Sequence, residues 1–316
     1  MRKTRRWVSK SPMPEAPAEK SNSLIGIILM VAAMLVMPFL DVVAKFLGQQ
    51  SFPVLEIVWG RLFFATLLTA PFVMASEGRQ GFVPTKPALH LGRAALVLVA
   101  TALFFGALKY QGIAETLAIF FVQPLVITAL SPLVLKEHVG LRRWMAVVVG
   151  FVGTLIIIRP GIQQYNPGML MALGAGFCSA LYMLLTRILA SQARAMASTF
   201  HTSLAGAVLA TLIVALVWET PTLEQWGLLV LLAFIATTGN YLIVRAYEYA
   251  EASLLAPFGY SEMIMAVIAG WYFFGDFPDG WTFVGVGILI ACAIYISYRE
   301  RARNLSHGYQ PPDIVT

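Results

Sequence analysis

Long runs of apolar residues, separated by short polar or charged segments, dominate the chain from residue 24 to residue 298. Each run is close to the ~20 residues that an α-helix needs to cross a bilayer. The runs are continuous and do not alternate with a period of two, which argues against a transmembrane β-barrel. The pattern therefore predicts an all-α integral membrane protein.

Ten of these runs are expected to form transmembrane helices. They cover residues 24–47, 53–75, 88–108, 113–135, 141–158, 168–190, 198–218, 226–246, 253–274 and 280–298. The connections are short, so the helices should form a compact bundle, because open backbone cannot face lipid. The flanking segments are expected to be a disordered cytoplasmic arm, residues 1–23, and a cytoplasmic tail, residues 299–316.

Composition and charge support a membrane setting. Of the 316 residues, 59% are hydrophobic and 12% are charged, whereas about 25% are charged in a soluble domain. The net charge of +6 comes from basic residues before the first span, after the last span and in alternate loops, with Arg93 assigned to the second loop. The positive-inside rule then predicts that both termini are cytoplasmic in a bacterial-type inner membrane. Nucleic acid is not an expected partner.

Motifs for catalysis or metal binding are not found in the sequence. Cys178 and Cys292 lie inside apolar runs, where core packing is expected of them. HExxH, GxSxG and Walker GxxxxGK[ST] patterns are absent from the sequence, so we expect neither an enzyme nor an ATP-driven pump. No catalytic residue, metal or cofactor is predicted.

The two halves of the chain show a sparse internal repeat. Shifts of 139 or 142 residues superpose, in order, Gly26 on Gly168, Lys45 on Arg187, Ala107 on Ala246, Tyr110 on Tyr249, and Glu137 on Asp276. Five spans per half is an odd number, so the halves, residues 24–160 and 166–298, should have opposite orientations. Inverted repeats commonly build transporters, with the substrate site at the repeat interface near the bilayer midplane.

Two segments resemble a known family. ALKYQGIAETLAIFFVQPLVITALSPLVLKEHVGLRRWMAVVVGFVGTLI and RAYEYAEASLLAPFGYSEMIMAVIAGWYFFGDFPDGWTFVGVGILIA are similar to the closing part of an EamA domain, of the drug/metabolite transporter superfamily. The shared features are small residues after a Tyr, Pro124 within the fourth span, an acidic residue ending the span, and a Gly-spaced final helix. The resemblance covers residues 24–298 and implies a secondary carrier that moves a small organic metabolite by alternating access.

The second half departs from this pattern at one proline. Met263 occupies the position that matches Pro124, and Pro257 lies earlier in the ninth span. Because proline interrupts helical hydrogen bonding, the ninth span is expected to bend nearer its cytoplasmic end.

Glu262 is the most informative polar residue, because it lies inside the apolar stretch LLAPFGYSEMIMAVIAGWYFF. A charge at mid-bilayer costs at least ~2.5 kcal/mol on insertion scales. Glu262 should lie ~13 Å deep at 1.5 Å per residue, on a helix face shared with Gly259, Ala266 and Ala269. It is a candidate for substrate contact or proton coupling, and a structural carboxylate held in an ion pair is the alternative.

Asp41 and Arg61 are candidate partners at similar depths, ~9 Å and ~12 Å from the outer ends of their spans. An Asp41–Arg61 pair would offset the desolvation of both groups. Arg61 could instead bind an anionic substrate group. Asp41 and Lys45 are spaced i,i+4, so a local pair competes.

Further candidates are polar or aromatic residues at depth. We expect a wall suited to a flat solute to include Trp59, Gln123, Asn240, Tyr241 and Tyr260. Each of these aromatic residues could equally serve packing or interfacial anchoring. Tyr182 also lies at depth, whereas His201 begins its span and is expected at the wetted cytoplasmic surface. Glu115, Glu137 and Asp276 lie at helix ends and are interpreted as boundary or gate residues.

The substrate is predicted from resemblance alone. The segments APFGYSEM and FGDFPDGW resemble those of bacterial uptake carriers, including carriers for riboflavin and for S-adenosylmethionine. The leading prediction is riboflavin uptake, since an aromatic cavity with scattered polar groups suits a flat vitamin. Export of amino acids or drugs, and S-adenosylmethionine uptake, are the alternatives, and a membrane-embedded enzyme is the alternative from another class. A homo-oligomer is left open.

Overall fold

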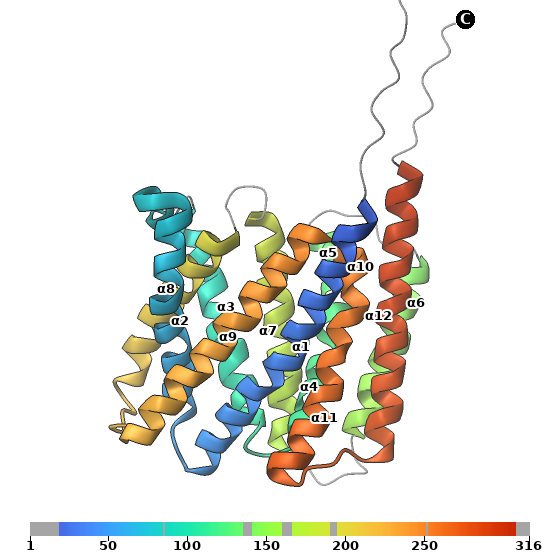
Figure 1. Cartoon of the computed structure of the whole chain (residues 1–316). Helices are drawn as coiled ribbons and strands as arrows, with labels where there is room; N and C mark the ends of the chain where they lie inside the picture. Colours follow the sequence, from blue (N-terminus) through green and yellow to red (C-terminus); the bar gives the residue numbers. More distant parts are fainter. Residues whose placement is uncertain are drawn as a thin grey trace, which may run out of the picture.

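The computed structural model describes residues 19–84, 86–134, 141–159, 166–189, 195–250 and 252–307 (Figure 1). Over these residues the chain forms α-helices and two short 3-10 helices. In order they are α1 (Glu19–Gln49), α2 (Val54–Glu77), η1 (Gly78–Phe82), α3 (Pro87–Ala107), α4 (Ile113–Phe120), α5 (Gln123–Val134), α6 (Leu141–Ile158), α7 (Pro167–Leu189), α8 (Ala195–Val214), α9 (Leu223–Tyr249), α10 (Ala252–Leu255), η2 (Ala256–Tyr260), α11 (Ser261–Phe274) and α12 (Gly280–His307).

These helices correspond to the predicted spans, with two of the spans interrupted. The fourth span is divided into α4 and α5, and the ninth into α10, η2 and α11. Within the described residues, seven helical stretches are long and apolar enough to cross a membrane, and α6 and α12 contribute shorter apolar segments. The all-α membrane fold expected from the sequence is therefore confirmed, and the helices fit the ten predicted spans.

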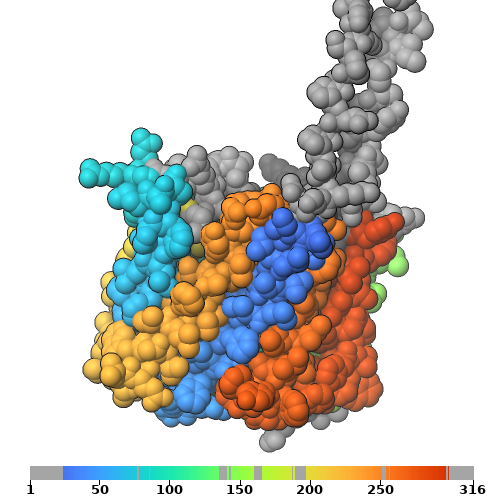
Figure 2. All heavy atoms as spheres, viewed as in Figure 1, coloured from blue at the N-terminus to red at the C-terminus, as the bar shows by residue number. Residues whose placement is uncertain are grey.

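Helix extends into both flanking segments that were expected to be loose. α1 already begins at Glu19, and α12 continues to His307. Residues 1–18 and 308–316 lie outside the described part of the chain, as do Glu137 and the side chain of Arg187. α1 begins and α12 ends at the same face of the bundle, at the top of Figures 1 and 2. We call this the terminal face, and the other end of the bundle the opposite face.

Two glycine contacts show that the halves are inverted. A β-carbon at Gly26 would lie 3.1 Å from the carbonyl oxygen of Ala246, and one at Gly168 would lie 3.1 Å from that of Ala107. The repeat superposes these two pairs on each other. The first contact joins the start of α1 to the end of α9, and the second joins the start of α7 to the end of α3. Equivalent contacts thus occur at opposite ends of the bundle.

Packing between helices follows the same symmetry and builds two walls. α1 packs along α9 and α11, while α3 packs along α7 and α8, and α4 and α5 also pack on α7. We call the first group, together with α2, the first wall, and the second group the second wall. Each wall combines helices from both halves. The walls meet where α2 packs on α8 and α11 packs on α4, while α12 and α6, which belong to neither wall, pack on each other.

The interruptions in the fourth and ninth spans lie side by side. α4 ends at Phe120 and α5 begins at Gln123, and η2 ends at Tyr260. The rings of Phe121 and Tyr260, which are superposed by the 139-residue shift, contact each other edge to face at 5.2 Å between centroids. The ninth span is interrupted from Ala256 onward, beside Pro257, so its interruption reaches further back than that of the fourth span.

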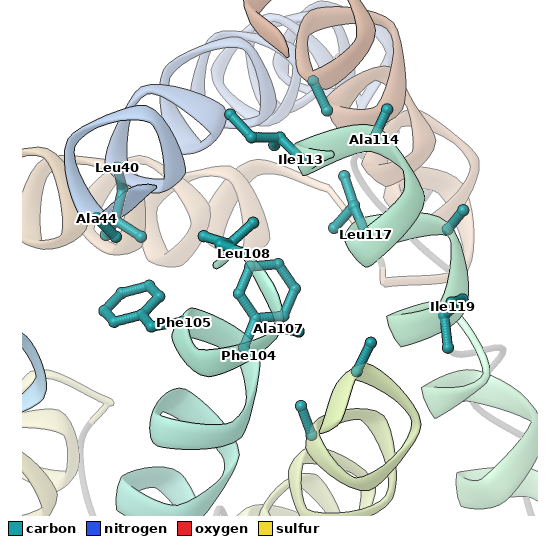
Figure 3. Close-up of a cluster of buried hydrophobic side chains, with 14 of the residues drawn as sticks. Leu40, Ala44, Phe104, Phe105, Ala107, Leu108, Ile113, Ala114, Leu117 and Ile119 are labelled. Carbon is teal, nitrogen blue, oxygen red and sulfur yellow. The ribbon is translucent and has the colours of Figure 1, made fainter. Parts of the chain in front are cut away.

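An apolar cluster fills the space between the walls toward the opposite face. Leu40 and Ala44 of α1 lie across from Phe105 and Leu108 of α3, and residues of α4 complete the cluster (Figure 3). Its members are almost fully buried, from Ile113 at 0% exposure to Phe104 at 8%. Among the described residues, this close packing fills the space between α1, α3 and α4.

Candidate substrate site

Three charged side chains from the first wall face the interior between the walls. Asp41 lies on α1 and is only 5% exposed. It interacts electrostatically with both Glu262 of α11 and Arg61 of α2. Two acids and one base from three helices thus share one region. Intramembrane charges that face a bundle interior mark substrate or ion pathways by default.

Arg61 connects this region to the second wall. Its Nη1 donates a hydrogen bond to Thr101 Oγ1 at 2.9 Å, and its guanidinium lies 5.8 Å from the centre of the Phe105 ring. It also interacts electrostatically with Tyr182 of α7. Among the residues that the structure describes, Arg61 and Asp41 do not approach within the 4.0 Å of an ion pair. The predicted Asp41–Arg61 salt bridge is therefore not formed here.

The predicted competitor of that bridge is not formed either. Lys45 Nζ donates hydrogen bonds to Asp276 Oδ2 and, at 2.9 Å, to the carbonyl oxygen of Gln111. Because the Lys45 ammonium turns toward the opposite face, it does not pair with Asp41 four residues earlier. The Asp41 carboxylate is left facing Arg61 and Glu262 across the interior.

Glu262 lies in the first turn of α11, directly after the 3-10 segment η2. The face of small residues predicted to accompany it is largely buried, with Ala266 at 0% and Ala269 at 2% exposure. A β-carbon at Gly259 would meet no atom within 4 Å, so open space lies beside the helix interruption. The open space at Gly259 thus lies three residues before Glu262 in the sequence.

Gln123 occupies the matching position in the first half, since the 139-residue shift superposes it on Glu262. It begins α5, and its Nε2 donates a hydrogen bond to Ser179 Oγ of α7 at 2.9 Å. Each interrupted span thus places one polar side chain at its second helical segment. Discontinuous helices at the midplane build the binding sites of many inverted-repeat carriers.

The other residues predicted for the site lie in different parts of the structure. Trp59 stacks on Phe63 at 4.9 Å and contacts Trp226 at 6.1 Å, within an aromatic cluster of α2 and α9. Tyr241 is 41% exposed on the outside of α9, and Asn240 is half-buried beside it. Tyr260 contacts Phe121 at the interruptions. The structure therefore brings Asp41, Arg61, Gln123, Tyr260 and Glu262 to the interior, and it places Tyr241 outside and Trp59 in a packing cluster.

Polar contacts join the two halves at the opposite face. Besides the Lys45–Asp276 pair, Arg159 pairs with Asp279, and Glu56 accepts a hydrogen bond from the Glu219 backbone N–H. A small pocket of about 100 Å³ lies between Glu115 and Asp276, two of the predicted boundary residues. These contacts and the apolar cluster close the interior toward the opposite face.

The Asp279 carboxylate, which pairs with Arg159, is also held by hydrogen bonds from Thr282. Burial alone would raise the pKa of this carboxyl, but hydrogen bonds from the Thr282 hydroxyl and backbone N–H, together with Arg159, bring the pKa below its ordinary value. Thr282 Oγ1 donates at 2.7 Å and its N–H at 2.9 Å. The carboxylate thus caps α12 and holds α6 at the same time.

A polar cluster near the terminal face was missed or misplaced by the sequence interpretation. Arg93, assigned there to a loop, is 2% exposed within α3. His201, expected at a wetted surface, is 7% exposed, and its ring lies 5.1 Å from that of His90. The signal that could have found Arg93 is its place seven residues into an apolar run beginning at Pro87.

Comparison with known proteins agrees with the geometry. The S-adenosylmethionine uptake transporter of Rickettsia bellii is 28% identical over 263 residues, which are 83% of this chain and 89% of that protein. The riboflavin transporter of Vibrio cholerae is 28% identical over 295 residues, 91% and 99% of the two chains. The pseudopaline exporter CntI of Pseudomonas aeruginosa is 26% identical over 285 residues, 87% and 97% of the two chains.

A solved crystal structure shares the fold, with a TM-score of 0.61 at 17% identity, over 91% of this chain and 99% of the other. The EamA-like transporter family matches residues 24–159 and 166–298. All three relatives are named as transporters or exporters. This chain belongs to the EamA-like transporter family and is a multi-pass membrane transporter of small molecules.

Proposed function

We propose that the chain is an uptake carrier for a charged, amino-acid-bearing metabolite, with S-adenosylmethionine as the first candidate. The observation that carries this proposal is the charge pattern of the interior. Two carboxylates, Asp41 and Glu262, and one guanidinium, Arg61, share the space between the walls. S-adenosylmethionine has a sulfonium, an ammonium and a carboxylate, so its charges complement all three groups.

Shape supports the same assignment. The adenine ring is flat and requires an apolar or aromatic surface, which Phe105 and Tyr182 of the second wall and Tyr260 of η2 can offer. In this arrangement the two cationic groups of the substrate face Asp41 and Glu262. The carboxylate faces Arg61, whose planar guanidinium suits two parallel hydrogen bonds.

Riboflavin is the second candidate and was the leading prediction from the sequence. The aromatic residues around the site and the 28% identity to the Vibrio cholerae riboflavin transporter favour it. Riboflavin is uncharged at neutral pH, so it offers no group of opposite charge to Asp41, Glu262 or Arg61. Burying unpaired charge is costly, and for this reason we place riboflavin second.

Orientation and mechanism follow from the fold. We propose that the terminal face is cytoplasmic, because the basic residues before the first span, after the last span and in alternate loops are predicted on the side that carries both termini. Alternating access would occur as one wall tilts against the other, opening the site to each face in turn. The contacts at the opposite face would then form the closed outer gate.

Counterflow into proteoliposomes tests the proposal. Vesicles that contain the purified carrier and unlabelled S-adenosylmethionine are diluted into a trace of the labelled compound, with riboflavin or excess S-adenosylmethionine as competitor. We expect labelled S-adenosylmethionine to accumulate and excess S-adenosylmethionine to abolish the signal, and we expect Asp41→Asn and Glu262→Gln to remove it. Accumulation of labelled riboflavin, with none of labelled S-adenosylmethionine, would favour the second candidate instead.

A further inference from the structure

Arg93 is a buried cation without an anion. It lies on α3 with 2% exposure, and no carboxylate comes within 4.0 Å of it in the described part of the chain. Its Nη1 donates to the Ser198 hydroxyl and its Nη2 donates to Tyr182 Oη at 3.3 Å, so both partners are neutral. Nε has no hydrogen-bond partner. A buried guanidinium is normally paired with a carboxylate or phosphate, because isolated buried charge is costly.

The surroundings of Arg93 add further unused polar groups. The Arg93 guanidinium lies 5.1 Å from the centre of the Tyr182 ring, in cation–π contact. Both ring nitrogens of His90, which is 2% exposed, lack a hydrogen-bond partner. The described residues thus supply at least three buried polar atoms here that bond to nothing. Such a group of atoms in a native interior indicates a place for a polar ligand or water.

Tyr182 joins this cluster to the candidate substrate site. Its hydroxyl accepts from Arg93, and it interacts electrostatically with Arg61. Arg61 is bonded to Thr101, and the rise of 1.5 Å per residue places Arg93 about 12 Å further along α3 toward the terminal face. Tyr182 therefore interacts with two guanidiniums, Arg61 of the first wall and Arg93 of the second.

We propose that Arg93 and Tyr182 form an anion subsite that receives the carboxylate of the transported substrate on its way between Arg61 and the terminal face. This inference rests on the proposed function for the identity of the carboxylate. The carboxylate replaces the Ser198 or Tyr182 hydroxyl as the partner of Arg93. The exchange is favourable because a hydrogen bond between two charged groups is about twice as strong as one to a neutral group.

The subsite also fixes the orientation of the substrate. The acids Asp41 and Glu262 belong to the first wall, and Arg93 and Tyr182 belong to the second. While its carboxylate is bound at Arg93, a zwitterionic head group therefore turns that carboxylate to the second wall and its ammonium toward the first. A substrate without the anionic group gains nothing from Arg93, so this residue determines specificity for anion-bearing substrates.

Binding to matched pairs of compounds tests this subsite. The purified, detergent-solubilised full-length carrier is titrated with S-adenosylmethionine and its decarboxylated form, and with riboflavin 5′-phosphate and riboflavin. The members of each pair differ mainly in the anionic group. The variants are Arg93→Gln, Arg93→Lys and Ser198→Ala. Arg245→Gln is the matched control, since Arg245 is bonded to Glu248 at 2.7 Å and already has an anion.

In the pair that the wild type prefers, Arg93→Gln is expected to weaken binding of the anionic compound by about tenfold or more. Binding of its uncharged or decarboxylated counterpart should change by no more than about twofold. Arg93→Lys should restore part of the preference for the anionic compound. Arg245→Gln should leave the binding of both compounds unchanged. Equal changes for both members, or none, would overturn the subsite. If Arg93 governs only the flavin pair, the subsite stands and the S-adenosylmethionine assignment falls. Size-exclusion profiles of each variant identify any that fail to fold.

Discussion

The Lys45–Asp276 pair is expected to act as a latch on the opposite face, and Asp276→Asn should loosen it. Lys45 lies on α1, in the first half, and Asp276 follows α11, in the second half. The Lys45 side chain is 9% exposed and that of Asp276 is 37% exposed. An exposed pair contributes about 0.2–1 kcal/mol and breaking a fully buried one costs about 3–5 kcal/mol, so solvent screening of Asp276 places this pair at about 1–2 kcal/mol.

If the latch forms only while the opposite face is closed, its loss shifts the population toward the open state. Each 1.4 kcal/mol is a factor of ten, so Asp276→Asn should raise the open fraction about five- to thirtyfold. Ala44 is 2% exposed within the apolar cluster that blocks the path, which makes Ala44→Cys a reporter of opening. Cys178 and Cys292 are first replaced, to leave one reactive thiol.

The assay measures how fast a charged, membrane-impermeant thiol reagent labels Ala44→Cys from the opposite face. Asp276→Asn should accelerate labelling about tenfold, and the swap Lys45→Asp with Asp276→Lys should return it toward the starting rate. Glu224→Gln is the matched control, because Glu224 is an exposed acid at the start of α9 on the same face. An unchanged labelling rate in Asp276→Asn, or a swap variant that is labelled as fast as Asp276→Asn, would refute the latch.

Three further predictions concern packing, pH and the aromatic residues. Gly285→Val should lower the melting temperature, since a β-carbon there would lie 2.4 Å from Ile157 Cγ1 on α6; Gly287→Val, where no atom lies within 4 Å, should leave it nearly unchanged. The pKa of Asp279 is lowered in the fold by its hydrogen bonds from Thr282 and by Arg159, so these contacts of the ionised carboxylate add stability at pH values above the ordinary pKa of about 3.9. That stability is lost as the pH falls through the lowered folded pKa, so the melting temperatures of wild type and Asp279→Asn should differ at pH 7 and 5 and begin to converge below about pH 4. Tyr260→Ala should reduce S-adenosylmethionine counterflow several-fold, while Tyr241→Ala, exposed on the outside of α9, should change it less than twofold; equal effects would argue against the assignment of Tyr260 to the interior.

The membrane fold could be read from the sequence because hydrophobic run length is a one-dimensional signal. The predicted spans 53–75 and 88–108 differ from α2 and α3 by only one or two residues at each end. The inverted repeat was also accessible, since an odd number of spans per half fixes the relative orientation. The interruption after Phe120 was not predicted: Pro124 lies close by, but the helix breaks before it.

Side-chain pairing was less predictable, because it depends on distances between helices that the sequence does not contain. Asp41 and Arg61 were matched by estimated depth alone, and depth does not say how each side chain is directed around its helix. Lys45 is four residues from Asp41, yet its ammonium bonds to Asp276 of the second half and to the carbonyl oxygen of Gln111. Arg93 was taken for a loop residue because charge near a span end usually snorkels to water.

The central claim is that Asp41, Glu262 and Arg61 together bind the charged groups of the substrate. Equilibrium binding of labelled S-adenosylmethionine to the purified carrier tests it most directly, with Asp41→Asn/Glu262→Gln compared with Glu224→Gln. The account predicts saturable binding that the double variant weakens at least about a hundredfold and that Glu224→Gln leaves unchanged. Binding of equal strength in the wild type and the double variant would contradict it.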